Sequence, residues 1–179
     1  MVKSFLLLAA MSIAAPATAT APQSRTPAVP GLGPIIPAPD AANQPDPSLR
    51  YAVVFNITKA QTDPTKPNPS LFNVARFLNL LATGGVRPAQ GDVVAIVHGA
   101  ATPLVMSDAA YRAKFQVPNP NLPLIAGLRK AGAQVHVCSQ ALHGQNIATE
   151  SVASDVTIDV SAGITLATLQ LRGFALIPD

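Results

Sequence analysis

The sequence is poor in the residue types that most often indicate a function: cysteine, tryptophan and charged residues. It holds one cysteine and no tryptophan among 179 residues, and only 12% of its residues are charged. A single cysteine excludes an intramolecular disulfide. The formal net charge of +3 is a small excess in a charge-poor chain, so the chain lacks the basic surface that nucleic acid requires, and we expect no nucleic-acid partner.

Several common site signatures are also missing. The sequence contains no Walker loop, no dinucleotide GxGxxG fingerprint, no GxSxG elbow and no HExxH helix. Its nine acidic residues are spread thinly, and no pair of carboxylates suggests acid–base catalysis. Asp63, Asp92 and Asp108 lie at the ends of expected elements, where capping is their more plausible role. No cofactor is indicated.

The first 19 residues have the layout of a secretory signal peptide. Lys3 gives a short positive region, residues 5–15 are apolar, and residues 17–19 form a small-x-small cleavage site. A membrane anchor is the alternative, but it needs about 20 apolar residues. We therefore expect cleavage after Ala19 and export, with a bacterial periplasm as the destination and no membrane attachment afterwards.

Residues 20–50 are rich in proline and show neither a helical nor a strand period. Such a composition predicts an extended tether, and a mobile linker is the simplest interpretation. The apolar patch GLGPIIP, residues 31–37, leaves open the alternative that the segment docks on the domain or on another subunit.

Residues 51–179 form the folded domain, in which strand and helix patterns alternate. Ser70 is the expected N-cap of the first helix, which ends at Gly84, and Pro120 is expected in the first turn of the third. This alternation predicts an α/β domain with a mostly parallel sheet of five strands. The strands are expected at 51–57, 92–99, 133–138, 154–160 and 174–178, and the helices at 70–84, 107–115, 119–132 and 161–173.

Two chemically useful side chains stand at predicted strand ends. Cys138 ends the third strand and His98 ends the second, and in parallel sheets ligand groups gather beyond the carboxyl ends of the strands. If these strands are neighbours, an imidazolium, or free N–H groups in the turn 139–144, would lower the thiol pKa and favour the thiolate. An inert, buried cysteine is an equally good interpretation.

The other histidines suggest structure more than chemistry. His136 lies within the third strand, where we expect it to be hydrogen-bonded, and His143 is expected in a solvated loop. Together with Cys138 and His98 they could supply zinc or copper ligands, but their spacing matches no metal motif. No metal site is therefore predicted, and metal binding remains the least favoured alternative.

Four segments of the domain resemble the DsrE/DsrF-like family, particularly its small exported members. They are VVAIVHGAAT, SDAAYRAKF, NPNLPLIAGLRKAGAQVHVCSQAL and SAGITLATLQLRGFALIP, and they occur in a consistent order. The resemblance implies a three-layer α/β/α sandwich that assembles into homo-oligomers, often trimers or hexamers. It also implies sulfur relay, in which a strand-end cysteine receives sulfane sulfur as a persulfide and passes it to a partner protein.

The resemblance assigns residues one by one. Cys138 matches the persulfide-forming cysteine, and Gln140 follows it in the same motif. The remaining matches are the His-Gly turn, the tyrosine and the Asn-Pro-Asn turn, which are His98 with Gly99, Tyr111, and Asn119 with Asn121. Where the family pattern reads Cys-Gly-Gln, this chain has Ser139. Serine excludes conformations that glycine allows, and its hydroxyl could reach the sulfur.

The leading hypothesis is an exported sulfur carrier or sulfurtransferase that accepts sulfane sulfur on Cys138. In this hypothesis His98 stabilises the thiolate, while Gln140 and Asn121 shape the pocket. The main alternative is an oligomeric binding module without catalysis, in which Cys138 serves packing or contacts a small ligand.

Overall fold

A computed structural model describes residues 26–179 of the chain. The predicted signal peptide, residues 1–19, lies outside this range, as do residues 20–25 of the proline-rich segment. The described part is an α/β fold built on one five-stranded sheet.

All neighbouring strands of the sheet run parallel, in the order β4-β3-β2-β1-β5. Each strand falls at a predicted position and is shorter than its predicted range, because pairing stops where the chain turns out of the sheet. The strands are β1 (Val53–Ile57), β2 (Val93–Val97), β3 (Gln134–Cys138), β4 (Thr157–Asp159) and β5 (Ala175–Ile177).

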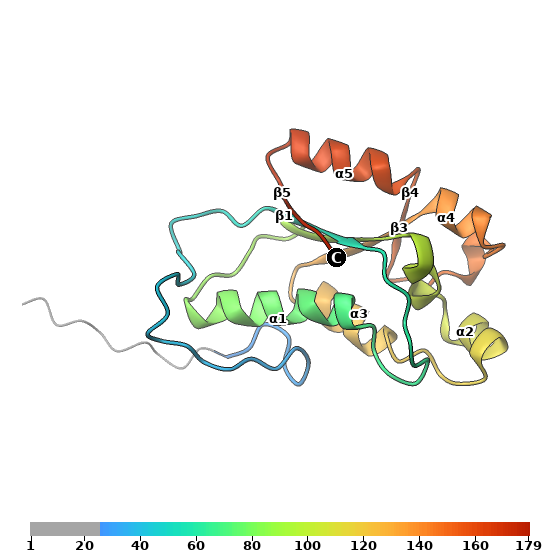
Figure 1. Ribbon diagram of the computed structural model, residues 1–179, viewed down its shortest axis with the longest axis horizontal. Helices are drawn as coiled ribbons and strands as arrows, with labels where there is room; N and C mark the ends of the chain where they lie inside the picture. The colour runs from blue at the N-terminus through green and yellow to red at the C-terminus, as the bar shows by residue number, and fades with distance from the viewer. Residues whose placement is uncertain (1–25) are drawn as a thin grey trace, which may run out of the picture.

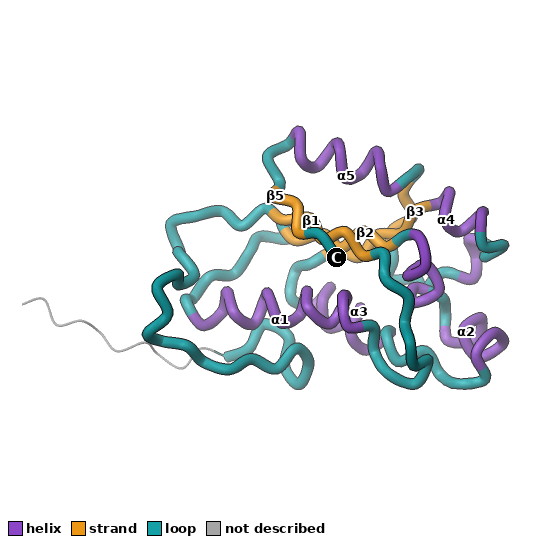
Figure 2. The backbone as a smooth tube through the Cα atoms, viewed as in Figure 1, coloured by secondary structure: helices purple, strands orange, loops and turns teal. Residues whose placement is uncertain are grey.

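Helices cover both faces of the sheet and make three layers. Figure 1 shows α1 (Pro69–Thr83) and α3 (Leu122–Lys130) on one face and α5 (Ala162–Leu171) on the other. Two shorter helices, α2 (Asp108–Phe115) and α4 (Ser139–Gly144), lie towards the carboxyl end of the sheet (Figure 2). Within residues 26–179 no helix is long and apolar enough to span a membrane.

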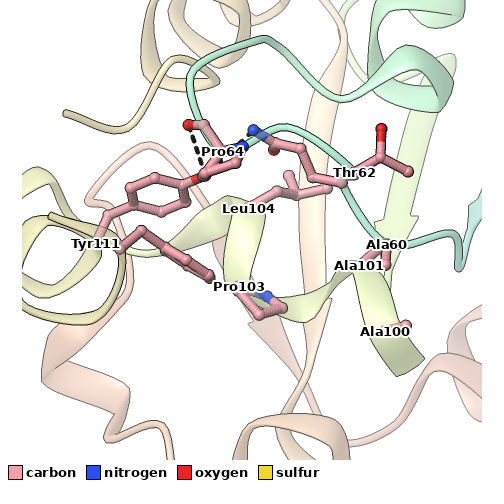
Figure 3. Close-up of a pocket in the computed structure, with 10 residues that line it drawn as sticks. Ala60, Thr62, Pro64, Ala100, Ala101, Pro103, Leu104 and Tyr111 are labelled. Carbon is pink, nitrogen blue, oxygen red and sulfur yellow. Dashed lines mark hydrogen bonds between the residues drawn. The ribbon is translucent and has the colours of Figure 1, made fainter. Parts of the chain in front are cut away.

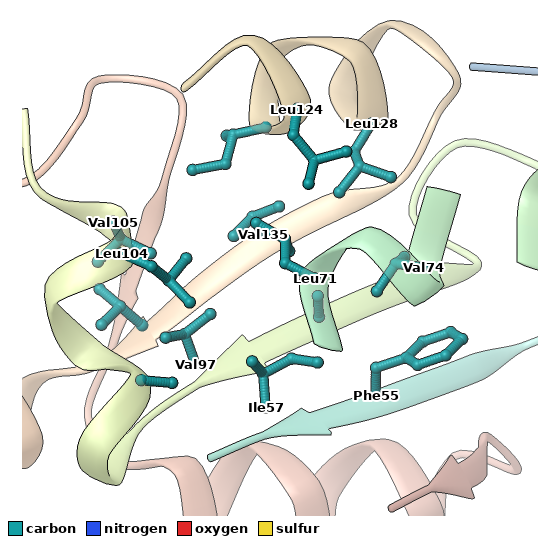
Figure 4. Close-up of a cluster of buried hydrophobic side chains, with 14 of the residues drawn as sticks. Phe55, Ile57, Leu71, Val74, Val97, Leu104, Val105, Leu124, Leu128 and Val135 are labelled. Carbon is teal, nitrogen blue, oxygen red and sulfur yellow. The ribbon is translucent and has the colours of Figure 1, made fainter. Parts of the chain in front are cut away.

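The larger hydrophobic core lies between the sheet and the α1–α3 layer. Leucines of both helices face apolar side chains of β1, β2 and β3, as Figure 4 shows for Leu71, Leu124 and Val97. Alternate residues of the same strands, such as Val54 and Ile96, form a smaller cluster under α5. Burial on both faces explains the continuous apolar runs of the central strands.

Two predicted helix starts are wrong, and both errors involve proline. Asn68, not Ser70, caps α1: its side chain accepts the N–H groups of Ser70 and Leu71, and Pro69 stands next to it where no N–H is required. In α3 the proline of the first turn is Pro123 rather than Pro120. Gly84 ends α1 as predicted.

Two short helices follow strand ends where the sequence predicts turns. Residues 139–144 form α4, which places His143 on a helix rather than in a loop, although its side chain is exposed as expected. A 3₁₀ helix, η1 (Gly99–Val105), follows β2, and a second, η2 (Thr149–Ser151), precedes β4. α4 and the two 3₁₀ helices are all too short to show a helical period in the sequence.

The described part of the proline-rich segment has no helix or strand, but it is docked on the domain. Val29 is 1% exposed and belongs to the main core. Asn79 of α1 accepts the N–H of Val29 at 2.8 Å and donates to the carbonyls of Val29, Leu32 and Gly33. Residues 29–33 are therefore not a mobile linker. They dock on the domain, as the alternative interpretation expected.

Candidate functional site

The carboxyl ends of three neighbouring strands bring Thr58, His98 and Cys138 into one row, called the thiol row below. Ile57 pairs with Val97, and Val97 pairs with Val137, so the residues after them are aligned across β1, β2 and β3. Neighbouring strands lie about 4.8 Å apart. The second and third strands are neighbours, which meets the condition set from the sequence, and thiol and imidazole stand at the ends of adjacent strands.

Cys138 is a free cysteine at the end of β3, and only 6% of it is exposed. It belongs to the smaller apolar cluster with Val54, Ile96 and Ala162, and so faces the side of the sheet that α5 covers. Among residues 26–179 no hydrogen bond joins its sulfur to the ring of His98. The thiol is therefore placed at the carboxyl edge of the sheet but sheltered from solvent.

His98 is hydrogen-bonded to the neighbouring strand. Its Nε2 lies 2.6 Å from Oδ1 of Asn56, which can only accept, so Nε2 carries the proton and Nδ1 keeps a lone pair. Burial lowers the pKa of His98, an effect that the negative charge of Asp179 partly opposes. Neutral imidazole is thus the favoured form, and His98 suits proton acceptance better than the predicted role of a fixed positive charge.

Ser139 and Gln140 turn their side chains to the end of β4. The Ser139 hydroxyl donates to the carbonyl of Val160 at 2.8 Å, and Nε2 of Gln140 reaches the same carbonyl at 3.3 Å. A hydroxyl has one proton to donate, so Ser139 does not offer it to the sulfur of Cys138. Ser139 opens α4 with a negative φ, so this position does not need the conformational freedom of glycine.

Gly99 has the conformation expected of a turn glycine, with φ of +57°. Its carbonyl accepts from the Thr102 hydroxyl at 2.7 Å and from Nε2 of Gln145 at 2.6 Å. The His-Gly turn is thereby tied to the segment that follows α4. It helps hold the ends of β2 and β3 in place.

Tyr111, Asn119 and Asn121 form a separate buried network. The tyrosine hydroxyl donates to the carbonyl of Pro64 and accepts from Gln61, whose Oε1 in turn accepts from Asn121. Asn119 donates to two carbonyls of the η1 region and accepts from Asn121. This network holds the loop after β1 to the turn before α3, so the predicted pocket role of Asn121 beside Cys138 gives way to a structural one.

A cavity of about 390 Å³ opens beside this network (Figure 3). Tyr111, Gln61 and Thr62 supply its polar side chains. The rest of its wall is largely apolar and includes Ala101 and Leu104 of η1. Cys138 and His98 do not line it. The residues assigned by resemblance therefore divide between the ends of β2 and β3, around Cys138, and the buried network beside this cavity, of which Tyr111 alone lines the cavity.

Sequence reasoning missed a second polar group on the α5 face of the sheet. Nδ1 of His136 lies 2.8 Å from Oδ2 of Asp159, which also accepts the Thr165 hydroxyl at 2.6 Å. Oε1 of Gln134 lies 3.1 Å from Nε2 of the same ring. His136 is hydrogen-bonded as predicted, in an open groove of about 500 Å³. The aspartate at the end of β4 was the signal that could have revealed the pair.

The acidic residues expected at element ends do stabilise turns and termini. Asp63 accepts from the N–H and the hydroxyl of Thr65, which lowers its pKa to about 2. Asp92 pairs with Arg50 at 2.6 Å, and Asp108 accepts from the N–H of Asn119. In the part of the chain that the structure describes, no three histidine, cysteine or acidic side chains are grouped to hold a metal ion.

The fold and the strand-end thiol define a class: small α/β domains with a parallel sheet and a lone cysteine at its carboxyl edge. The chain belongs to the DsrE/DsrF-like family, whose family model matches residues 50–178. No curated protein matches.

Two solved structures share the fold. One is MTH1491, a protein of unknown function from Methanobacterium thermoautotrophicum, at 17% identity and a TM-score of 0.51, covering 72% of this chain and 99% of that one. The other is the YchN protein of E. coli, at 17% identity and a TM-score of 0.50, covering 73% and 100%.

Proposed function

We propose that the protein is a sulfur carrier or sulfurtransferase that accepts sulfane sulfur as a persulfide on Cys138. Membership of the DsrE/DsrF-like family supports a role in sulfur relay. The observation that carries the proposal is the position of the only thiol, at the carboxyl end of β3 and aligned with His98 on β2. This is where parallel sheets gather reactive groups.

The proposed reaction is a displacement at sulfur. The Cys138 thiolate attacks the outer sulfur of a donor such as thiosulfate, a new S–S bond forms, and the old one breaks with its electron pair leaving on sulfite. The thiol proton has to leave first, and Nδ1 of His98 has the free lone pair to accept it. The persulfide then passes its outer sulfur to an acceptor, for which we propose a partner protein.

Burial of the thiol restricts the donor. With 6% of Cys138 exposed and an apolar cluster around it, a small inorganic sulfur species reaches the sulfur more easily than a bulky one. Gln140, in the first turn of α4 next to Ser139, is the polar side chain that we expect to meet such a donor. We assign it the pocket role.

Intact mass measurement tests the proposal. Protein incubated with thiosulfate or polysulfide is expected to gain the mass of one or more sulfur atoms, reversibly by reductant, and a Cys138→Ser variant is expected to gain none. His98→Gln should slow the gain without abolishing it. A wild-type protein that takes up no sulfur under these conditions would overturn the assignment.

A binding module without catalysis is the second candidate. It is favoured by the sheltered thiol and by the cavity of about 390 Å³ that Cys138 does not line. In that case alkylation of Cys138 in the folded protein should be as slow as for an ordinary buried thiol and should not respond to His98→Gln. Fast, His98-dependent alkylation would favour sulfur transfer.

We further propose that the protein is exported to the periplasm and works there as a homo-oligomer, a trimer or hexamer. The support for export is the layout of residues 1–19. The support for assembly is α5, which has no charged residue, leaves Ile164 and Leu171 exposed, and fully buries only Ala162 within the chain. Mass spectrometry of mature protein should give an N-terminus at Thr20, and its absence from a periplasmic extract would contradict export.

A further inference from the structure

Asp179 lies on a group of three hydrogen-bond donors at the end of β1. Its Oδ2 accepts from the N–H of Thr58 at 2.7 Å, the N–H of Lys59 at 2.6 Å and the Thr58 hydroxyl at 3.0 Å. Two consecutive main-chain N–H groups aimed at one oxygen form the kind of concave arrangement that binds anions. The carboxylate is supplied from 120 residues further along the chain.

The donors favour a negative charge in this place. Burial raises the pKa of Asp179, but hydrogen bonds from the Ser70 hydroxyl, Thr58 and Lys59 outweigh it, and the net pKa lies below the ordinary value. The same charge is felt by His98, whose pKa it raises against the effect of burial. An anion held at Thr58 therefore acts on the row of residues that contains the thiol.

Asp179 is held at the margin of the sheet. It follows β5, an edge strand of three residues in which Ala175 and Leu176 are exposed. Its departure would cost the hydrogen bonds from Thr58, Lys59 and Ser70. The donors belong to the loop after β1, so they are not part of the segment that carries the carboxylate.

We propose that the donors of Thr58 and Lys59 form a binding site for a small oxyanion, such as sulfate, sulfite or thiosulfate, and that Asp179 is an internal occupant which the anion displaces. The three donors now share a single acceptor, Oδ2 of Asp179. A tetrahedral oxyanion would offer them several acceptor oxygens. A tethered carboxylate competes at an effective concentration of roughly millimolar or above, so the free anion binds weakly until Asp179 is removed. The site does not require Cys138 to react.

The test is a sulfate titration followed by NMR at the amides of Thr58 and Lys59. Asp179→Ala should bind sulfate with a Kd at least about tenfold lower than wild type, because the tethered competitor is gone. Asp155→Ala is the matched control, since it removes the same charge from an exposed pair with Arg129 and should titrate like wild type. Adding Thr58→Val to Asp179→Ala should weaken binding again.

Asp179→Asn gives a second measurement with a smaller change of shape, and an intermediate Kd is expected. The proposal is overturned if the two amides do not move in folded Asp179→Ala, or if Asp155→Ala tightens binding as much. Because Cys138→Ser leaves the donors intact, failure of sulfur uptake and failure of anion binding are separate results.

Discussion

At the scale of single residues, Ser139 stands where the resemblance to the family implies a glycine, and it opens a regular helix. Glycine at this position would be needed only for a positive φ or a very close approach. Ser139 instead opens α4 in an ordinary conformation and ties it to β4 through the carbonyl of Val160. The substitution therefore exchanges flexibility next to Cys138 for one more hydrogen bond.

Ser139→Gly should consequently destabilise the protein. Loss of the hydrogen bond and the entropy of glycine together should lower the free energy of unfolding by about 1–2 kcal/mol, measured by urea denaturation. Sulfur uptake on Cys138 should persist, since the hydroxyl does not contact the sulfur. Ser154→Gly, in an exposed turn, is the control, and equal losses in both variants would contradict the assigned role of the hydroxyl.

The lowered pKa of His98 predicts a pH dependence of stability. The unfolded chain takes up a proton near the ordinary value of 6.5, whereas the folded chain resists it. The unfolded state therefore binds more protons below pH 6.5, and stability should rise with pH up to that value and gain nothing from His98 above it. Between about pH 5 and 6.5 carboxylates contribute little.

Urea unfolding at several pH values checks this sign. His98→Gln should flatten the rise between about pH 5 and 6.5. His143→Gln, on the exposed side of α4, should keep the wild-type slope. An unchanged slope in His98→Gln would show that the imidazole is not the group responsible.

At the scale of elements, α1 does more than cover the sheet, because it also holds the proline-rich segment. Asn79 satisfies one N–H and three carbonyls of residues 29–33. Gly33 fits closely on the helix, since a Cβ there would lie 2.5 Å from the N–H nitrogen of Arg76. The segment is therefore anchored by specific contacts, and composition alone does not reveal them.

Asn79→Ala should release this anchor. The variant should lose about 1–3 kcal/mol of unfolding free energy, and residues 26–50 should become accessible to protease, as seen by fragment masses. Asn73→Ala, on the exposed face of the same helix, should change neither quantity. Equal protease resistance in wild type and Asn79→Ala would mean that the apolar contacts of Val29 and its neighbours hold the segment without Asn79.

At the scale of the whole molecule, features set by local sequence patterns could be predicted, whereas features set by contacts between distant segments could not. The apolar runs of β1, β2 and β3 and the caps Ser107 and Ser161 mark their elements locally, so the α/β alternation could be predicted. Strand order and the placing of Asn121 depend on contacts between distant segments. The thiol row could be predicted only conditionally, because it requires β2 and β3 to be neighbours.

The surface of α5 that faces away from the sheet is also a feature of the whole molecule, because nothing in the described chain covers it. Ile164 and Leu171 of this helix are 59% and 90% exposed, Val160 just before it is 69% exposed, and the helix contains no charged residue. Large apolar side chains that are left exposed side by side mark interaction surfaces, and a second copy of this chain is the partner that the proposed homo-oligomer supplies. The open sheet face beside His136 lies next to it.

Substitution of these side chains by charge should therefore break the assembly. Ile164→Lys combined with Leu171→Glu introduces charges that cannot be buried without cost, so sedimentation velocity should show a shift from the oligomer to the monomer, with the helical circular dichroism retained. Ile36→Glu is the matched control, because Ile36 is as exposed as Leu171 but lies in the proline-rich segment, and it should leave the oligomer intact. A wild type that sediments as a monomer at micromolar concentration would refute the interface, whereas dissociation by Ile36→Glu alone would move it from α5 to the proline-rich segment.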